Sequence, residues 1–277
     1  MTDKSILITG CSSGIGYDAA QGLKARGWRV FATCRQEADC ERLRGEGLES
    51  FVLDYADEAS IEAALAEALS RTGGTLDAVF NNGAFALPGA VEDLPRDGLR
   101  AIYETNLFGV HDLTRRVLPV MRKQGHGRIV NNSSILGFVA LRWRGAYNST
   151  KFAMEGLTDT LRLEMRGTGI KIILVEPGPV TSDLRKKAIP HFEKWIDWKA
   201  SARARQYENE LMPRLYKEDR GRDPFELPAS AVTKKLIHAL ESPRPKARYR
   251  ITTPTKVAAV LKRILPGSAM EWIQAKI

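Results

Sequence analysis

The sequence holds few residues suited to cross-linking or to tight metal binding. Among its 277 residues are 3 cysteines and 4 histidines. The cysteines are Cys11, Cys34 and Cys40, an odd number without the spacing of metal ligands. We therefore expect reduced thiols in a cytoplasmic protein, and no metal site.

Long hydrophobic runs are also missing. Because a spanning helix needs about 18 or more consecutive apolar residues, none is predicted. The first residues lead straight into an apolar strand at 5–9, which favours neither a signal peptide nor a transit peptide. A hydrophobic content of 43% is enough for one sizeable core, so residues 1–277 are predicted to form a single domain.

Acidic residues are scarce in the last third of the chain. The net charge is +9, and residues 185–277 hold 21 Lys and Arg against 10 Asp and Glu. No nucleic-acid-binding module accompanies this excess, so no nucleic-acid partner is predicted. A solvated basic face is the favoured interpretation, while a membrane surface or an anionic substrate stays open.

Short apolar segments alternate with amphipathic ones along most of the chain. This alternation predicts an α/β fold, a doubly wound parallel sheet in three layers with right-handed crossovers. Ligands of such a sheet bind at the carboxyl ends of its strands. Strands are expected at 5–9, 29–33, 49–53, 76–80, 127–132, 171–176 and 248–252, and helices at 15–26, 59–71, 100–122, 147–166 and 229–240.

Tyr147 and Lys151 are four residues apart on a predicted helix, so they share one face. A phenol has a reference pKa of about 10, and lowering it to about 7 takes about 4 kcal/mol. One ammonium at about 4 Å supplies that much in an effective dielectric of about 20. The pair is therefore a candidate general acid and base, although a surface helix pair has the same spacing.

Two further motifs accompany this pair. The turn Gly10-Cys11-Ser12-Ser13-Gly14-Ile15-Gly16 lies between the first strand and the first helix. Such a turn lets backbone amides approach a pyrophosphate at a helix N-terminus. Ser134 follows the strand at 127–132, thirteen residues before Tyr147, and its hydroxyl can hydrogen-bond a reacting carbonyl oxygen.

Taken together, these motifs resemble the short-chain dehydrogenase/reductase family over residues 5–180. The resemblance rests on Thr9-Gly10-x-x-x-Gly14-Ile15-Gly16, Asn81-Asn82-Gly83-Ala84, Asn106, Ser134, Tyr147-x-x-x-Lys151 and Pro177-Gly178. The residues from Ala146 to Leu157 resemble the subgroup of retinol and 17β-hydroxysteroid dehydrogenases and bacterial NADP-dependent aldehyde reductases. The resemblance implies a Rossmann fold and hydride transfer between NADP(H) and a lipophilic alcohol or carbonyl, such as an aldehyde or a retinoid- or steroid-like ketone.

In the catalytic site that the resemblance implies, Tyr147 protonates the carbonyl oxygen and Ser134 orients it. Lys151 lowers the tyrosine pKa and holds the nicotinamide ribose, and Asn106 supports a water in the proton relay. The cofactor contacts implied are Gly10, Ser12, Ser13, Gly14, Ile15, Gly16, Arg35, Asp54, Asn82, Gly83, Tyr147, Lys151, Pro177, Gly178, Val180 and Thr181.

The chain departs from the family pattern at two places. Asn81-Asn82-Gly83-Ala84 stands where most relatives have Asn-Asn-Ala-Gly, which puts the local backbone in doubt. Cys34 takes the place of the aspartate of NAD-specific relatives, and Arg35 follows it. Because a guanidinium suits a 2′-phosphate, we expect NADP(H) to be preferred over NAD(H).

The substrate pocket is predicted to include Phe85, Leu136, Phe138 and Trp143, capped by an insertion at 182–227. An amphipathic helical segment at 254–277 could lie on a membrane, cap the pocket or pack against a second subunit. Packing is favoured, so peripheral membrane contact is possible but not expected. By resemblance, the helices at 100–122 and 147–166 build a homodimer or homotetramer.

Two other functions remain open at this point. The chain could be a catalytically silent dinucleotide-binding sensor, although Ser134, Tyr147 and Lys151 argue against that. It could also be an epimerase or dehydratase of a nucleotide sugar, but that branch usually has a longer substrate domain.

Overall fold

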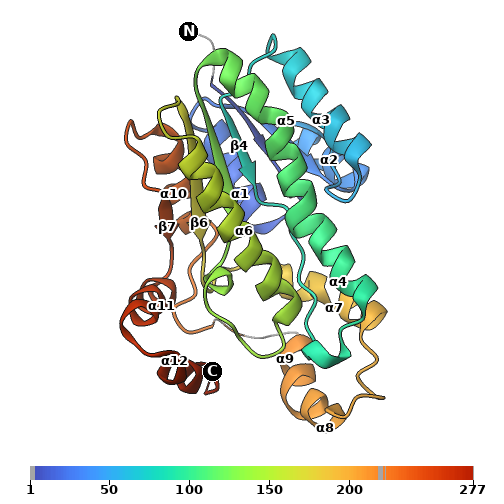
Figure 1. Ribbon diagram of the computed structural model, residues 1–277. Helices are drawn as coiled ribbons and strands as arrows, with labels where there is room; N and C mark the ends of the chain where they lie inside the picture. Colours follow the sequence, from blue (N-terminus) through green and yellow to red (C-terminus); the bar gives the residue numbers. More distant parts are fainter. Residues whose placement is uncertain (1–3, 218–220, 222, 277) are drawn as a thin grey trace.

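The computed structural model describes residues 4–217, 221 and 223–276. Parts of the predicted segments 182–227 and 254–277, namely 218–220, 222 and 277, lie outside the described residues, as do residues 1–3 of the predicted domain. Within the described part, seven parallel strands form one sheet in the order β3-β2-β1-β4-β5-β6-β7 (Figure 1). The strands are β1 Ser5–Ile8, β2 Arg29–Cys34, β3 Glu49–Val52, β4 Ala78–Asn81, β5 Gly127–Asn132, β6 Ile170–Glu176 and β7 Arg248–Arg250.

Helices cover both faces of the sheet, because successive strand side chains point to opposite sides. Ile6 and Ile8 pack in one apolar cluster with helices α1, α2 and α10, whereas Leu7 packs in another with α3, α5 and α6. The prediction of a doubly wound, three-layered Rossmann fold is confirmed. The helices are α1 Gly14–Lys24, α2 Glu37–Gly45, α3 Glu58–Arg71, α5 Gly109–Gln124, α6 Gly145–Glu164 and α10 Ser230–Glu241.

The helix expected at 100–122 is longer and less regular than its sequence indicates. It consists of α4 Arg96–Tyr103, a π-helical turn Glu104–Phe108 and α5, in direct succession. A Cβ on Gly109 would lie 2.2 Å from the carbonyl oxygen of Tyr55, which belongs to the loop after β3. A glycine is therefore needed where the helix crosses this loop. The widened turn places Asn106 toward the interior, fully buried.

A helical cap lies beyond the carboxyl ends of the strands. It comprises α7 Leu184–Trp195, α8 Ala204–Gln206, the π-helical turn Tyr207–Leu211 and α9 Met212–Leu215. Its apolar side chains form a third cluster with residues of α4 and with Tyr147 of α6. The 3₁₀ turns Val91–Asp93 and Ile135–Gly137 border this region.

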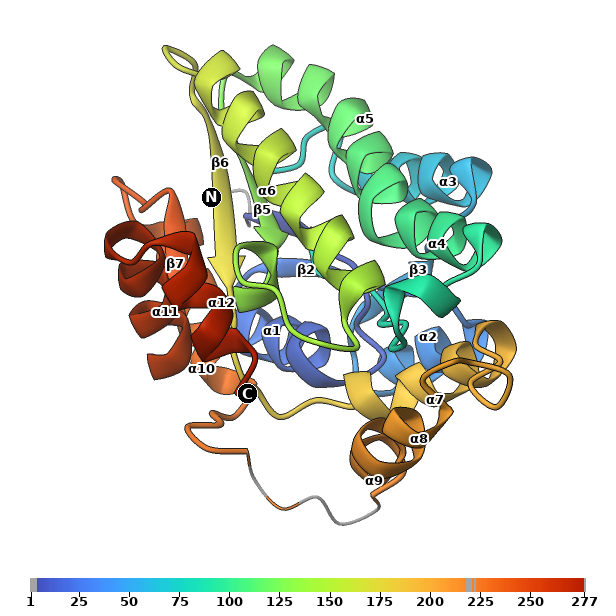
Figure 2. The same ribbon diagram turned by 60° about the horizontal axis from the view of Figure 1, so that its bottom comes forward.

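The chain ends in α11 Thr253–Ile264 and α12 Gly267–Gln274. In Figures 1 and 2 this pair and the α7–α9 cap lie on opposite sides of the N-terminal end of α6. Val257, Val260 and Ile264 of α11 are 49%, 57% and 67% exposed in the single chain, so packing of these side chains against a second subunit stays a prediction. The smaller Thr255 and Ala259 face inward instead, which brings the helix close to the core.

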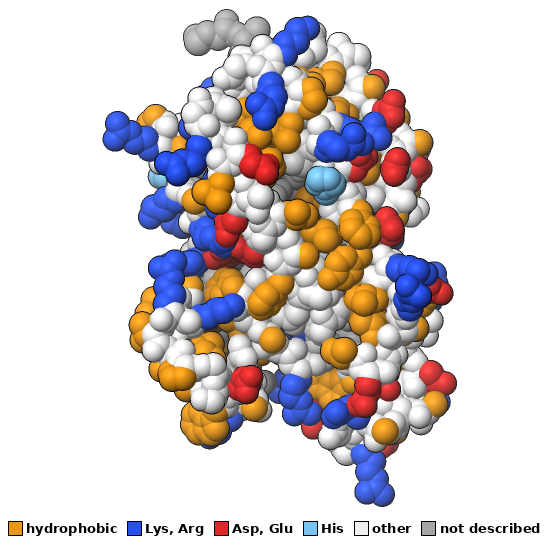
Figure 3. Space-filling model, viewed as in Figure 1, with side chains coloured by type: hydrophobic (Ala, Val, Ile, Leu, Met, Phe, Trp, Pro, Cys, Tyr) orange, Lys and Arg blue, Asp and Glu red, His pale blue; other side chains and the backbone are white. Residues whose placement is uncertain are grey.

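Hydrophobic side chains also gather on the outer face of α5 and α6 (Figure 3). Phe152, Leu157 and Leu163 of α6 and Phe108 beside α5 are all 40% exposed or more. Within the ranges described above, no helix is both long and apolar enough to cross a bilayer.

Candidate active site

The turn after β1 has the shape of a phosphate-binding cradle. Gly10 and Gly14 have φ values of 69° and 59°, which side chains with a Cβ rarely adopt. A Cβ on Gly16 would lie 2.3 Å from the Gly10 carbonyl oxygen, so α1 can begin this close to the strand only with glycine there. The α1 N-terminus consequently opens toward the space above the turn, where its dipole favours an anion.

Asn82 braces this turn from the end of β4. Its side-chain amide donates to the Thr9 and Gly10 carbonyls at 2.9 and 3.2 Å, and its oxygen accepts from Asn132 at 2.8 Å. A Cβ on Gly10 would come within 2.8 Å of the Gly83 Cα, so glycine at position 10 lets the two loops touch. A Cβ on Gly83 would lie 3.1 Å from the Tyr55 ring, a tight contact that the swapped motif avoids.

Ser134, Tyr147 and Lys151 come together at the carboxyl edge of the sheet. Lys151 Nζ donates to the Asn132 carbonyl at 2.7 Å and lies 5.5 Å from the centroid of the Tyr147 ring. The Ser134 hydroxyl accepts from the Leu136 amide at 3.1 Å and is near enough to the Tyr147 phenol to lower its pKa. Tyr147 and Lys151 are only 8% and 2% exposed, so this group is largely shielded from bulk water.

The acidity of Tyr147 differs from the expectation. Burial raises its pKa to about 12, and the Ser134 hydroxyl and the Arg144 charge offset only part of that rise. The Lys151 ammonium lies 5.5 Å from the centroid of the Tyr147 ring and donates to the Asn132 carbonyl, and its lowering of the Tyr147 pKa stays a prediction. At neutral pH Tyr147 is therefore a protonated phenol, the form that can donate a proton to a carbonyl oxygen.

The pKa of Lys151 in turn depends on Glu155, which lies one helical turn further along α6. Burial lowers the pKa of Lys151 to about 8, and the nearby Glu155 carboxylate opposes that change. Glu155 is ion-paired with Arg248 of the edge strand β7, which also pairs with Glu176 of β6. The sequence analysis missed this ionic group, because its members come from three separate segments.

Asn106 lies behind the catalytic group and holds the backbone rather than a side chain of the site. Its amide donates to the Phe85 carbonyl at 2.9 Å and its oxygen accepts from the Phe85 amide at 3.0 Å. It also donates to the Thr150 hydroxyl at 3.3 Å. The π-helical turn thus ties the loop after β4 to the middle of the Tyr147–Lys151 segment.

The loop after β6 lies beside the same site. The Pro177 carbonyl accepts from the Ile135 amide at 2.7 Å, next to Ser134. A Cβ on Gly178 would come within 2.1 Å of the Thr252 hydroxyl, so this loop is seated against the start of α11. Val180 is bridged to Leu227, and the Thr181 hydroxyl donates to Glu226 at 2.7 Å.

The predicted pocket residues divide into two groups. Phe85, Leu136 and Trp143 are partly buried against the apolar cluster that contains Tyr147. Phe138 does not belong to that cluster, and its carbonyl accepts from Lys262 of α11 at 2.6 Å. Its place in the substrate pocket stays a prediction.

Two cations near the glycine turn were not predicted. Arg42 of α2 donates to the Ser12 carbonyl at 2.8 Å, and Lys187 of α7 donates to the Ser12 and Ser13 hydroxyls at 3.1 and 2.7 Å. Arg35 is exposed after β2; burial lowers the pKa of His191 of α7, and the Arg35 charge lowers it further. Asp54, at the end of β3, accepts from the Ala56 amide at 3.0 Å.

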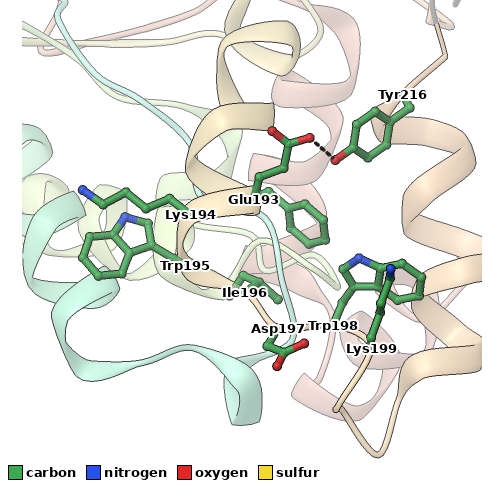
Figure 4. Close-up of a pocket in the computed structure, with 9 residues that line it drawn as sticks. Glu193, Lys194, Trp195, Ile196, Asp197, Trp198, Lys199 and Tyr216 are labelled. Carbon is green, nitrogen blue, oxygen red and sulfur yellow. Dashed lines mark hydrogen bonds between the residues drawn. The ribbon is translucent and has the colours of Figure 1, made fainter.

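A hollow of about 370 Å³ indents the cap away from this group (Figure 4). Glu193 of α7 accepts from the Tyr216 hydroxyl at 2.8 Å along its wall. Since no predicted site residue borders it, this hollow is a feature of the cap and not of the catalytic site. Its lining residues are Phe192, Glu193, Lys194, Trp195, Ile196, Asp197, Trp198, Lys199 and Tyr216.

Comparison with known proteins places the chain in a family. The model of the short chain dehydrogenase family matches residues 4–192. An uncharacterized oxidoreductase, YbbO of Escherichia coli K12, is 37% identical over 271 residues, which cover 98% of this chain and 93% of that protein. Human retinol dehydrogenase 16 is 32% identical over 290 residues, covering 99% and 89%. The chain therefore belongs to the short-chain dehydrogenase family of oxidoreductases.

A solved structure gives the same result for the fold. The actinorhodin polyketide ketoreductase, determined with NADPH, is 28% identical with a TM-score of 0.72, over 90% of this chain and 95% of that one. The resemblance found from the motifs is thus confirmed, including its retinol dehydrogenase relatives.

Proposed function

We propose that the protein is an NADP(H)-dependent oxidoreductase that interconverts lipophilic carbonyl compounds and alcohols. The observation that carries this proposal is the convergence of Ser134, Tyr147 and Lys151 beside the glycine cradle, within one buried group. Phe85, Leu136 and Trp143 pack near Tyr147 and offer an apolar surface to the substrate.

The residues around the cradle fit a nicotinamide dinucleotide. The α1 N-terminus and Lys187 would hold phosphate groups, and Lys151, which makes one hydrogen bond to the protein, keeps donors for the ribose hydroxyls. When bound, the reduced nicotinamide supplies hydride to a carbonyl carbon. In that reaction Tyr147 donates a proton to the carbonyl oxygen, Ser134 orients the oxygen, and the Lys151 ammonium stabilises the phenolate left behind.

The preference for NADP(H) is supported by the cations near Ser12 and Ser13. Arg42 of α2 and Lys187 of α7 contact these serines, and Arg35, which follows β2, is near His191 of α7. A 2′-phosphate carries charge that such groups recognise. Cys34, the last residue of β2, is buried and supplies no carboxylate for the ribose of NAD.

The test compares NADPH with NADH as reductants of aromatic and medium-chain aldehydes, retinal and steroid ketones. We expect kcat/KM to favour NADPH, and Arg35→Ser to raise KM for NADPH at least tenfold while changing KM for NADH little. Arg44→Ser is the matched control, since Arg44 is an exposed arginine of α2 that pairs with Glu37. NADH preference in the wild type contradicts the assignment of Arg35.

We also propose that two copies associate through the outer faces of α5 and α6, giving a homodimer or a homotetramer. The exposed Phe152, Leu157 and Leu163 of α6 support this, because contiguous apolar surface of this kind is typical of an interface.

A further inference from the structure

Arg144 occupies an unusual place for a positive charge, the residue that caps the N-terminus of α6. Its carbonyl accepts from the Asn148 amide at 2.7 Å, and its backbone is bridged to Gly89, so its position beside the helix is fixed. It precedes Tyr147 by three residues, and its charge reaches the Tyr147 phenol. Arg144 therefore begins the helical turn that carries the proton donor of the site, and its charge acts on that donor.

Among the described residues, the Arg144 side chain has no hydrogen-bond or ion-pair partner. Although Arg144 stands at the N-cap position, its side chain makes no capping hydrogen bond. A cation at a helix N-terminus also opposes the helix dipole. The side chain is partly buried, and this burial lowers its pKa. A desolvated and unpaired charge is costly unless a counter-ion joins it.

The cap adds positive charge opposite Arg144. Arg185 of α7 and Arg214 of α9 are both close enough to repel it, while Asp223 attracts it. The Asp223 carboxylate is already engaged by Arg185 at 3.3 Å. The region between the cap and the N-terminus of α6 is therefore positive, although it adjoins an apolar cluster that includes Trp143 and Phe192.

We propose that Arg144 forms a subsite for an anionic group of the substrate, a carboxylate on the compound whose carbonyl reacts at Tyr147. The proposal rests on the proposed carbonyl chemistry and narrows its substrates to oxo-acids with an apolar body. A guanidinium binds a carboxylate through two parallel hydrogen bonds, which would also fix the orientation of the carbonyl. The apolar cluster would hold the body of the molecule between the two polar ends.

The test uses two aldehydes that differ in charge alone, 4-formylbenzoate and its methyl ester, with NADPH as reductant. The readout is the ratio of their kcat/KM values, because a change in Tyr147 acidity alters both rates alike. We expect the wild type to favour the acid at least tenfold. Arg144→Gln should lower the ratio of kcat/KM values about tenfold, and Arg144→Lys should lower it less. The matched control is Arg205→Gln, an exposed arginine of the cap.

A ratio near one in the wild type, or an equal loss for both aldehydes in Arg144→Gln, overturns the subsite. A second measurement does not depend on turnover: calorimetric titration of the enzyme–NADPH complex with benzoate and with methyl benzoate. If neither aldehyde is reduced, the proposed function fails for these compounds, and the titration alone then tests the anionic subsite. Benzoate binding that weakens tenfold in Arg144→Gln then supports the subsite, whereas absent or unchanged binding overturns it.

Discussion

At the scale of single residues, Tyr147 combines a raised pKa with a position at the centre of the site. A phenol that stays protonated at neutral pH can donate to a carbonyl oxygen, whereas accepting a proton from an alcohol needs the phenolate, which is scarce at that pH. We therefore expect the rate of alcohol oxidation to rise with pH.

Replacement of Tyr147 by phenylalanine should lower kcat by about 10²–10⁴-fold, the usual contribution of a general acid. The affinity for NADPH should change little, because the glycine cradle is untouched. Stopped-flow absorbance of the nicotinamide and a fluorescence titration with NADPH measure the two quantities. Tyr103→Phe in α4 is the control, and a Tyr147→Phe enzyme with normal turnover contradicts the role.

Glu155 should set the pH range of the enzyme through Lys151. With a Lys151 pKa of about 8, kcat/KM for aldehyde reduction should fall above that pH as the ammonium is lost. The Glu155 carboxylate raises this pKa, so Glu155→Gln should move the alkaline limb to lower pH. Glu164→Gln at the exposed end of α6 should leave the profile in place. If the alkaline limb of Glu155→Gln stayed at the same pH, the Glu155 carboxylate would have no effect on the pKa of Lys151.

At the scale of elements, the π-helical turn at Glu104–Phe108 holds the loop after β4. Asn106→Ala removes both hydrogen bonds to Phe85 and should cost about 1–3 kcal/mol of unfolding free energy, because buried polar groups lose their partners. Urea denaturation measures this loss. Glu104→Ala, exposed in the same turn, should cost under about 1 kcal/mol. Equal midpoints for the two variants would mean that the turn does not depend on Asn106.

The regular elements could be predicted from the sequence because their signals are local. The strand expected at 127–132 has those bounds in the structure, and the apolar runs of the other strands differ by a few residues. The π-helical turn could not be predicted, since it depends on Phe85 and on the close passage of Gly109 over Tyr55. No local pattern distinguishes such a turn from an ordinary helix.

The candidate site also has a part that local motifs predict and a part that they do not. Ser134, Tyr147 and Lys151 are tied to motifs at fixed spacing, so their neighbourhood could be predicted. Arg42 and Lys187 reach the glycine turn from remote helices, and Lys262 of α11 donates to the Phe138 carbonyl. Contacts of this kind arise from tertiary packing, which the spacing of a motif does not contain.

At the scale of the whole molecule, the apolar outer face of α6 should be covered by a second copy. We expect light scattering to give the mass of two or four chains. Leu163→Asp, at a position 65% exposed, should shift the protein toward the monomer, because a carboxylate would be buried in the interface. Trp272→Asp in α12, at a position 63% exposed, is the control. A monomeric wild type would refute the association.

The contact between Lys187 and the glycine turn also bears on the sequence of events in a catalytic cycle. Because Lys187 belongs to the cap and touches Ser12 and Ser13, the same helix that covers the substrate also closes over the phosphate cradle. A dinucleotide in this cradle would therefore meet Lys187 of the cap as well as the N-terminus of α1, which couples cofactor binding to the position of the cap. We expect the dinucleotide to bind before the substrate and to leave after the product, an order that product-inhibition kinetics would test.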